Sequence, residues 1–148
     1  MAWYDDTYTE KDWRLGTRKR SVDGKEFVFL QGVASCEADE AVTYQDNDYI
    51  AVRSLANAVG KVAISQAAVT ASLYGWFQIY GPSTVQTDAS VAADVQMFLT
   101  STAGDLDDAD VAGDTIIGMY STAADDSSAL TTAVTLNYPH VADKDIDA

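Results

Sequence analysis

The chain has 148 residues and a mass of 15.9 kDa, and 47% of its residues are apolar, which is enough for one domain with a sizeable core. One cysteine excludes an intramolecular disulfide framework, and one cysteine with one histidine excludes a Cys/His zinc site. A net charge of −14 opposes binding to nucleic acid or to an anionic membrane, because both begin with neutralisation of phosphate.

The charge is unevenly distributed along the chain. Residues 1–26 carry six basic and six acidic side chains, whereas residues 27–148 carry three basic and 17 acidic ones. The first part is therefore neutral, and the rest carries all of the net charge. We interpret the triplet Arg18-Lys19-Arg20 as a solvated turn or a contact with an acidic partner, with a phosphate contact as the lesser alternative.

Residues 1–22 form a polar N-terminal arm that fits neither a helical nor a strand period. Four of the 15 aromatic residues of the chain lie in its first 13 positions: Trp3, Tyr4, Tyr8 and Trp13. Aromatic side chains in an arm are typical anchors for a partner surface, so we predict that these four, with Arg14, bind a partner. The alternative is that they fold back over the body of the same chain.

Residues 23–138 are predicted to form a β domain. Apolar residues alternate with a period of two most clearly in residues 130–138, and further strands are expected at 25–31, 49–52, 73–80, 95–100 and 115–121. Residues 73–80 carry apolar or aromatic side chains on both faces, which is typical of a central strand. Glycine and aspartate pairs separate these runs as turns. The expected fold is a small antiparallel β-sandwich or barrel, followed by an acidic tail at residues 139–148.

Residues 90–99 fit both a helical spacing and a strand alternation, and the favoured interpretation is a loop at 89–94 followed by the strand at 95–100. Residues 54–59 have apolar side chains at helical spacing and are predicted to form a short helical turn. The uncharged stretch 62–87 is too polar to span a bilayer as a helix. The N-terminus lacks the basic and apolar regions of a signal peptide, so we expect synthesis in the cytoplasm.

An acidic cluster is the only candidate for metal binding, and it is a weak one. It consists of Asp105, Asp107, Asp108 and Asp110, followed by Asp114. The spacing fails the calcium-loop pattern of an EF-hand, so the favoured interpretation is a solvated acidic loop, and no metal or other cofactor is expected.

No catalytic constellation emerges from the sequence. Cys36 and His140 are the only thiol and imidazole, and the acidic neighbours of Cys36 would raise the pKa of a thiol. Nucleotide-binding and metalloprotease motifs are absent from the sequence. We therefore expect a protein that is not an enzyme.

Several short motifs in a fixed order resemble the small head decoration, or cement, proteins of tailed bacteriophages. The resemblance covers residues 15–139 and rests on the stretches 15–17 (LGT), 23–32 (DGKEFVFLQG), 74–81 (YGWFQIYG), 91–94 (VAAD), 99–104 (LTSTAG) and 113–118 (GDTIIG). The sequence departs from the family pattern at Ala93-Asp94, where a glycine is expected before the acid.

The resemblance implies a non-enzymatic protein that binds the major capsid protein on the outer surface of a phage head and stabilises the lattice. It also implies self-association as a dimer or trimer. Deletion of residues 1–14 is then expected to abolish capsid binding and to leave the body folded. The alternatives are another virion component (a tail-tube, head–tail adaptor or fibre-base protein) and a calcium-dependent carbohydrate-binding module, in which Trp76 and Tyr80 would stack on sugars.

Overall fold

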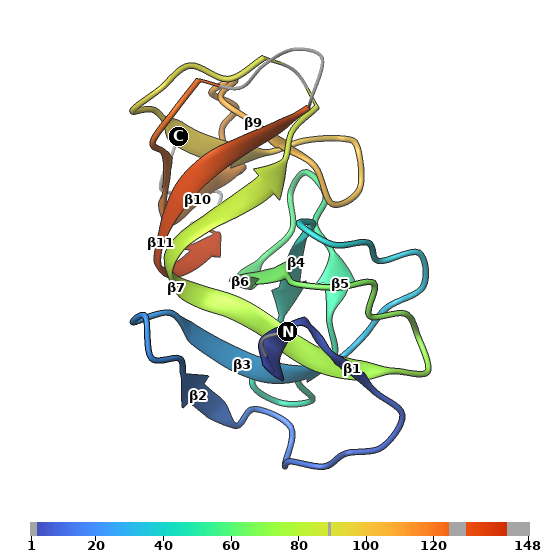
Figure 1. Cartoon of the computed structure of the whole chain (residues 1–148). Helices are drawn as coiled ribbons and strands as arrows, with labels where there is room; N and C mark the ends of the chain where they lie inside the picture. Colours follow the sequence, from blue (N-terminus) through green and yellow to red (C-terminus); the bar gives the residue numbers. More distant parts are fainter. Residues whose placement is uncertain (1–2, 89, 125–129, 142–148) are drawn as a thin grey trace.

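The computed structural model describes residues 3–88, 90–124 and 130–141, and all of its regular elements but one are β-strands (Figure 1). The exception is a short 3-10 turn, η1 (Trp3–Asp5). The strands are β1 (Thr7–Tyr8), β2 (Arg18–Arg20), β3 (Glu26–Gln31), β4 (Ala41–Tyr44), β5 (Val52–Arg53), β6 (Gly60–Ser65), β7 (Tyr74–Gln86), β8 (Gln96–Leu99), β9 (Leu106–Asp107), β10 (Thr115–Ser121) and β11 (Thr131–Val141). The predicted all-β class is confirmed.

The strands form one antiparallel sheet that folds over on itself in the manner of a sandwich and does not close into a barrel. Its order is β2-β3-β7-β6-β11-β10-β8-β9, with β1 paired to β7, β4 to β6, and β5 to β4. In Figure 1 the strands β1–β6 and the first half of β7 lie below, and β8–β11 lie above. Within the described residues, no helix has the length and apolarity needed to cross a membrane.

Strand β7 joins the two halves of the sheet and bends in its middle. Its first half pairs with β3 and β6, and its second half pairs with β11. The bend falls at Gly81, whose φ of +96° favours glycine. The buried side chain of Gln78 holds the bend, because its Nε2 donates hydrogen bonds to Tyr80 O at 3.0 Å and to Pro82 O at 2.8 Å.

The core consists of three clusters because the central strands bury both of their faces. On β3, Val28 and Leu30 join a cluster with β4 and the residues around Val69, whereas Phe27 and Phe29 point to the opposite face. A larger cluster lies between β6 and β8–β11. This two-sided burial is the pattern that the sequence predicts for a central strand.

An ion pair with a buried carboxylate helps to hold the two halves together, because its arginine also reaches the loop between β8 and β9. Glu40 is almost fully buried, and its carboxylate accepts hydrogen bonds from Arg53 Nε at 2.9 Å and Nη2 at 2.7 Å. Arg53 Nη2 also donates to Ala103 O at 3.2 Å. Gly104 packs against the carboxylate, since a Cβ on this glycine would lie 2.7 Å from Glu40 Cδ.

The predicted strands at 25–31, 73–80, 95–100, 115–121 and 130–138 correspond to β3, β7, β8, β10 and β11. Strands β1, β2, β4, β6 and β9 were not predicted: β1, β2 and β9 have only two or three residues, and β4 and β6 are buried on both faces and carry few aromatic residues. The expected strand at 49–52 is displaced to β5, and the predicted helical turn at 54–59 is a single turn closed by a hydrogen bond from Ala58 N to Leu55 O at 3.1 Å. Residues 139–141, assigned from the sequence to the tail, belong to β11.

Candidate binding surface

The N-terminal aromatic side chains pack on the body of their own chain, which was the alternative interpretation of the sequence. Trp3, Tyr4, Tyr8 and Trp13 lie half-buried on a cluster of three fully buried rings, Phe27, Phe29 and Trp76. Residues 3–20 therefore lie along the sheet instead of projecting from it as a free arm, with β1 paired to β7 and β2 paired to β3.

The contacts in this cluster are mostly edge-to-face. Trp3 and Trp13 lie 5.2 and 5.1 Å from Trp76, centroid to centroid, and Tyr4 stacks on Phe27 at 4.3 Å. Tyr8 Oη donates a hydrogen bond to Trp3 O at 3.1 Å, and partial burial raises the pKa of the Tyr8 hydroxyl above its usual value. The rings form a preorganised layer whose outer side remains open to solvent.

Arg14, the fifth residue predicted to bind a partner, follows Trp13 of this layer in the chain. Its side chain is exposed, and its carbonyl accepts a hydrogen bond from Thr17 N at 3.0 Å. We call residues 3–17 the N-terminal face. The structure thus brings the five predicted partner-binding residues into one continuous part of the molecule, but whether they bind a partner stays a prediction.

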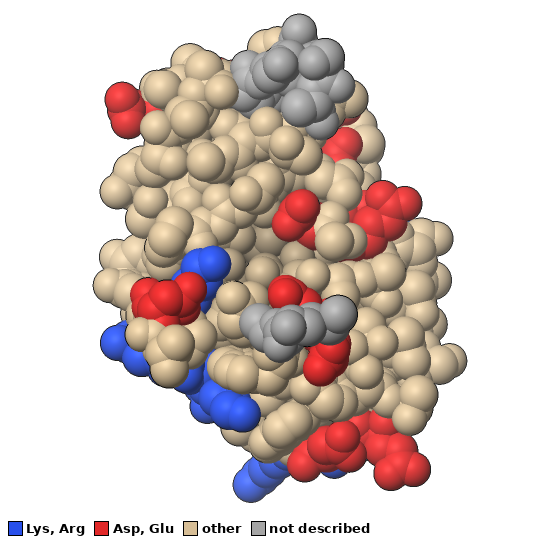
Figure 2. Space-filling view, viewed as in Figure 1, with Lys and Arg blue, Asp and Glu red and all other residues tan. Residues whose placement is uncertain are grey.

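Strand β2 carries a cationic edge next to the N-terminal face, along the lower left of Figure 2. Lys19 points to the aromatic layer, with Nζ 4.5 Å from the centroid of Trp3. Arg18 and Arg20 point to the opposite side, and their guanidinium carbons lie 5.7 and 5.6 Å from the ring centroids of Tyr138 and Tyr80. The triplet that the sequence analysis interpreted as a turn or contact is therefore an exposed strand.

Two adjoining hollows lie beside this cationic edge. One, of 370 Å³, is lined by the three basic residues of β2 with Glu26 and Tyr138. The other, of 430 Å³, is lined by Tyr80, Gly81, Pro82, Tyr120, Thr135, Leu136 and Asn137. Tyr80 and Tyr138 connect them, with their centroids 5.2 Å apart. Neither Tyr138 nor Tyr120 was predicted from the sequence to belong to a site. Each lies near the end of a run of alternating apolar residues, and this was the one sequence feature that pointed to an exposed aromatic ring.

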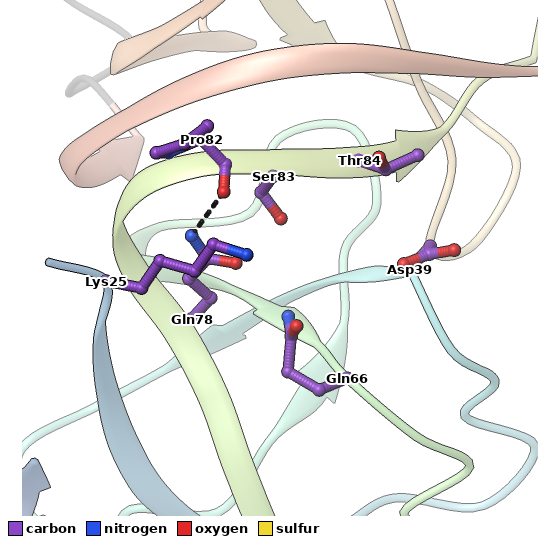
Figure 3. Close-up of a pocket in the computed structure, with 7 residues that line it drawn as sticks. All are labelled: Lys25, Asp39, Gln66, Gln78, Pro82, Ser83 and Thr84. Carbon is purple, nitrogen blue, oxygen red and sulfur yellow. Dashed lines mark hydrogen bonds between the residues drawn. The ribbon is translucent and has the colours of Figure 1, made fainter. Parts of the chain in front are cut away.

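A separate polar cleft of 310 Å³ lies at the bend of β7 (Figure 3). Its lining residues are Lys25, Asp39, Gln66, Gln78, Pro82, Ser83 and Thr84. Burial, and then the negative charge of Asp5, raises the pKa of Asp39. Figure 3 shows Lys25 beside Gln78 and Asp39 at the far end of the cleft. These groups offer hydrogen bonds to a polar molecule, but the lining contains one carboxylate and no thiol or imidazole.

The acidic cluster does not form a cage. Asp107 Oδ1 accepts a hydrogen bond from Ala109 N at 3.1 Å, and Asp108 Oδ2 accepts one from Ala92 N at 3.0 Å. Burial, reinforced by Asp88, raises the pKa values of Asp105 and Asp107. Asp110 is exposed on the loop that follows. Among the residues that the structure describes, no three His, Cys, Asp or Glu side chains gather closely enough to hold a metal ion.

The thiol and the imidazole lie in different surroundings. Cys36 is buried in the cluster that β3 and β4 form with the residues around Val69, and burial raises the pKa of its thiol. His140 is exposed on β11, opposite Lys61 of β6. Neither family models nor curated protein sequences match this chain.

Proposed function

We propose that this protein is a non-enzymatic decoration protein that binds the major capsid protein on the outside of a tailed-phage head and stabilises the lattice. The observation that carries the proposal is the N-terminal face: a layer of partly exposed aromatic rings, within the part of the chain (residues 1–26) whose charges balance, fixed on an otherwise strongly acidic body.

This arrangement suits attachment to a large protein shell. Aromatic rings supply much of the binding energy of protein interfaces, and rings already held in place lose little side-chain entropy on docking. Tyr4 and Trp13, held by Phe27 and Trp76, are such rings. The negative charge elsewhere keeps many closely displayed copies soluble and apart.

Two alternative functions would also use exposed aromatic side chains. Another virion role, such as a tail-tube, adaptor or fibre-base protein, would use the same kind of surface, and copy number separates it from decoration. A carbohydrate-binding module is less well supported, because Trp76 is fully buried and cannot stack on a sugar. Of the two aromatics that favoured sugar binding, only Tyr80 reaches the surface.

The proposal is tested with purified virions and with capsids assembled from their major capsid protein. Quantitative mass spectrometry should find hundreds of copies in each particle; about six or twelve would indicate a connector. Absence from particles would overturn the proposal.

Binding through the N-terminal face is tested by cosedimentation with capsids. Arg14→Glu should weaken binding at least about tenfold, which corresponds to roughly 1.4 kcal/mol. Lys61→Glu is the matched control, because it makes the same charge change on β6 and should bind as the unmodified protein does. Equal binding by both variants would exclude the N-terminal face as the contact surface.

A further inference from the structure

The open edge of β2 has the properties of a site for an added strand. Strand β2 pairs with β3 on one side, and no described strand pairs with its other side. Ser21 N–H donates to Lys25 O at 2.8 Å, so Ser21 bonds to the β3 side. Because strand residues alternate in direction, the N–H and C=O groups of Arg18 and Arg20 point away from β3.

The side chains at this edge specify the charge of an incoming strand. Arg18 and Arg20 share one carboxylate, Glu26, at 3.9 and 3.7 Å, and their side chains are 51% and 59% exposed. Two cations on one anion leave an excess positive charge on this side of the strand. Charged side chains at a sheet edge prevent indiscriminate pairing, so a neutral or basic strand is disfavoured here and an acidic strand is favoured.

The chain itself contains a segment with matching charges. Residues 143–147 read Asp-Lys-Asp-Ile-Asp, and they are the only place where three acidic residues follow one another at a spacing of two. In an extended strand, the three aspartates lie on one face, and Lys144 and Ile146 lie on the other. This segment lies outside the described residues.

We propose that residues 143–147 of a second copy add to the open edge of β2 and so join copies of this chain. In an antiparallel register with Ile146 opposite Lys19, Asp145 and Asp147 lie opposite Arg20 and Arg18. Each aspartate then faces an arginine. Ile146 lies on the side of the aromatic layer.

The course of β11 favours a second copy over the same chain. β11 passes β2 at Tyr138, whose hydroxyl donates to Glu26 Oε1 at 3.2 Å. By Val141 the strand is paired with Gly60 of β6 and Ile116 of β10. The same chain would have to reverse and retrace about 10 Å, the length of three strand residues, before Asp145. A second copy is free of that constraint, and mutual exchange closes a ring of two or three copies.

This inference rests on the proposed function for its purpose, since linked copies bind a repeating lattice with avidity. Its test needs no capsid, however. Sedimentation velocity measures the self-association of the full chain against two double variants, Asp145→Asn/Asp147→Asn and Arg18→Asp/Arg20→Asp. The control Asp125→Asn/Asp126→Asn removes the same number of negative charges elsewhere.

We expect the full chain and the control to associate equally, and each test variant to associate at least about tenfold more weakly. Circular dichroism verifies that all four proteins are folded. Mixing the Arg18→Asp/Arg20→Asp variant with an Asp145→Arg/Asp147→Arg variant should restore association, because each supplies the charge that the other lacks. A purely structural role of Arg18 and Arg20 would give no such rescue.

A monomeric full chain, or test variants that associate as tightly as the control, would overturn the inference. The capsid assay separates this failure from failure of the proposed function. If a monomeric full chain still cosediments with capsids through the N-terminal face, the decoration function is supported and strand exchange is excluded. If copies exchange strands but bind no capsid, the strand exchange is supported and the proposed decoration function is excluded.

Discussion

Replacement of Trp13 by alanine tests whether the N-terminal aromatics are part of the core of the free protein. The ring of Trp13 lies 5.1 Å from Trp76 and 5.4 Å from Phe29, and both partners are fully buried. Truncation exposes one side of each to water. A fully buried tryptophan contributes roughly 3–5 kcal/mol when truncated. Since Trp13 is half-buried, we expect a loss of about 2 kcal/mol in the free energy of unfolding.

The assay is urea unfolding followed by far-ultraviolet circular dichroism, which does not depend on the fluorophore that the substitution removes. The midpoint should fall with the slope unchanged, because a changed slope would mean an altered denatured state or a further transition. Tyr120→Ala is the control: its ring is 49% exposed on β10, and its loss should stay below about 1 kcal/mol.

A loss below about 0.5 kcal/mol for Trp13→Ala would refute the reasoning, because such values are typical of surface positions outside any packed cluster. The N-terminal face would then detach from the body without a cost. Deletion of residues 1–14 would leave the body intact, as the sequence predicted. The packing seen here indicates instead that this deletion uncovers Phe27, Phe29 and Trp76 and destabilises the body.

Three further predictions concern the core. Arg53→Met removes the cationic partner of the buried Glu40 and should lower the free energy of unfolding by roughly 3–5 kcal/mol; a loss below about 1 kcal/mol would contradict this. Gly104→Ala should lower the melting temperature more than Gly24→Ala does: both glycines have positive φ, but a Cβ at Gly104 meets Glu40 and one at Gly24 meets nothing. Equal effects would mean that backbone strain alone matters. Burial raises the pKa of Tyr44 to about 12. The unfolded chain ionises first, at about 10, so stability should fall as pH rises from 10 to 12, by up to about 3 kcal/mol. In Tyr44→Phe, the slope of stability against pH over that range should be shallower, and an unchanged slope would exclude Tyr44 as its source.

The sequence determined the fold class and about half of the strands, because both follow from local alternation and turn residues. Residues 130–138 alternate clearly and form most of β11. It also identified the aromatic and basic residues that build the candidate surface. Strands β4 and β6 were not predicted, because two-sided burial removes the period of two and, unlike the equally buried β3 and β7, they carry few aromatic residues that would indicate a strand.

Only the tertiary structure decided where the N-terminal aromatics lie. Their sequence is equally compatible with a free arm and with a layer on the body, since local pattern does not record the cluster of Phe27, Phe29 and Trp76 that receives them. The same holds for the cationic edge: which backbone groups of Arg18 and Arg20 stay open depends on the pairing of β2 with β3. The sequence gives the chemistry of each side chain directly, but contacts between distant segments arise only when the whole chain packs.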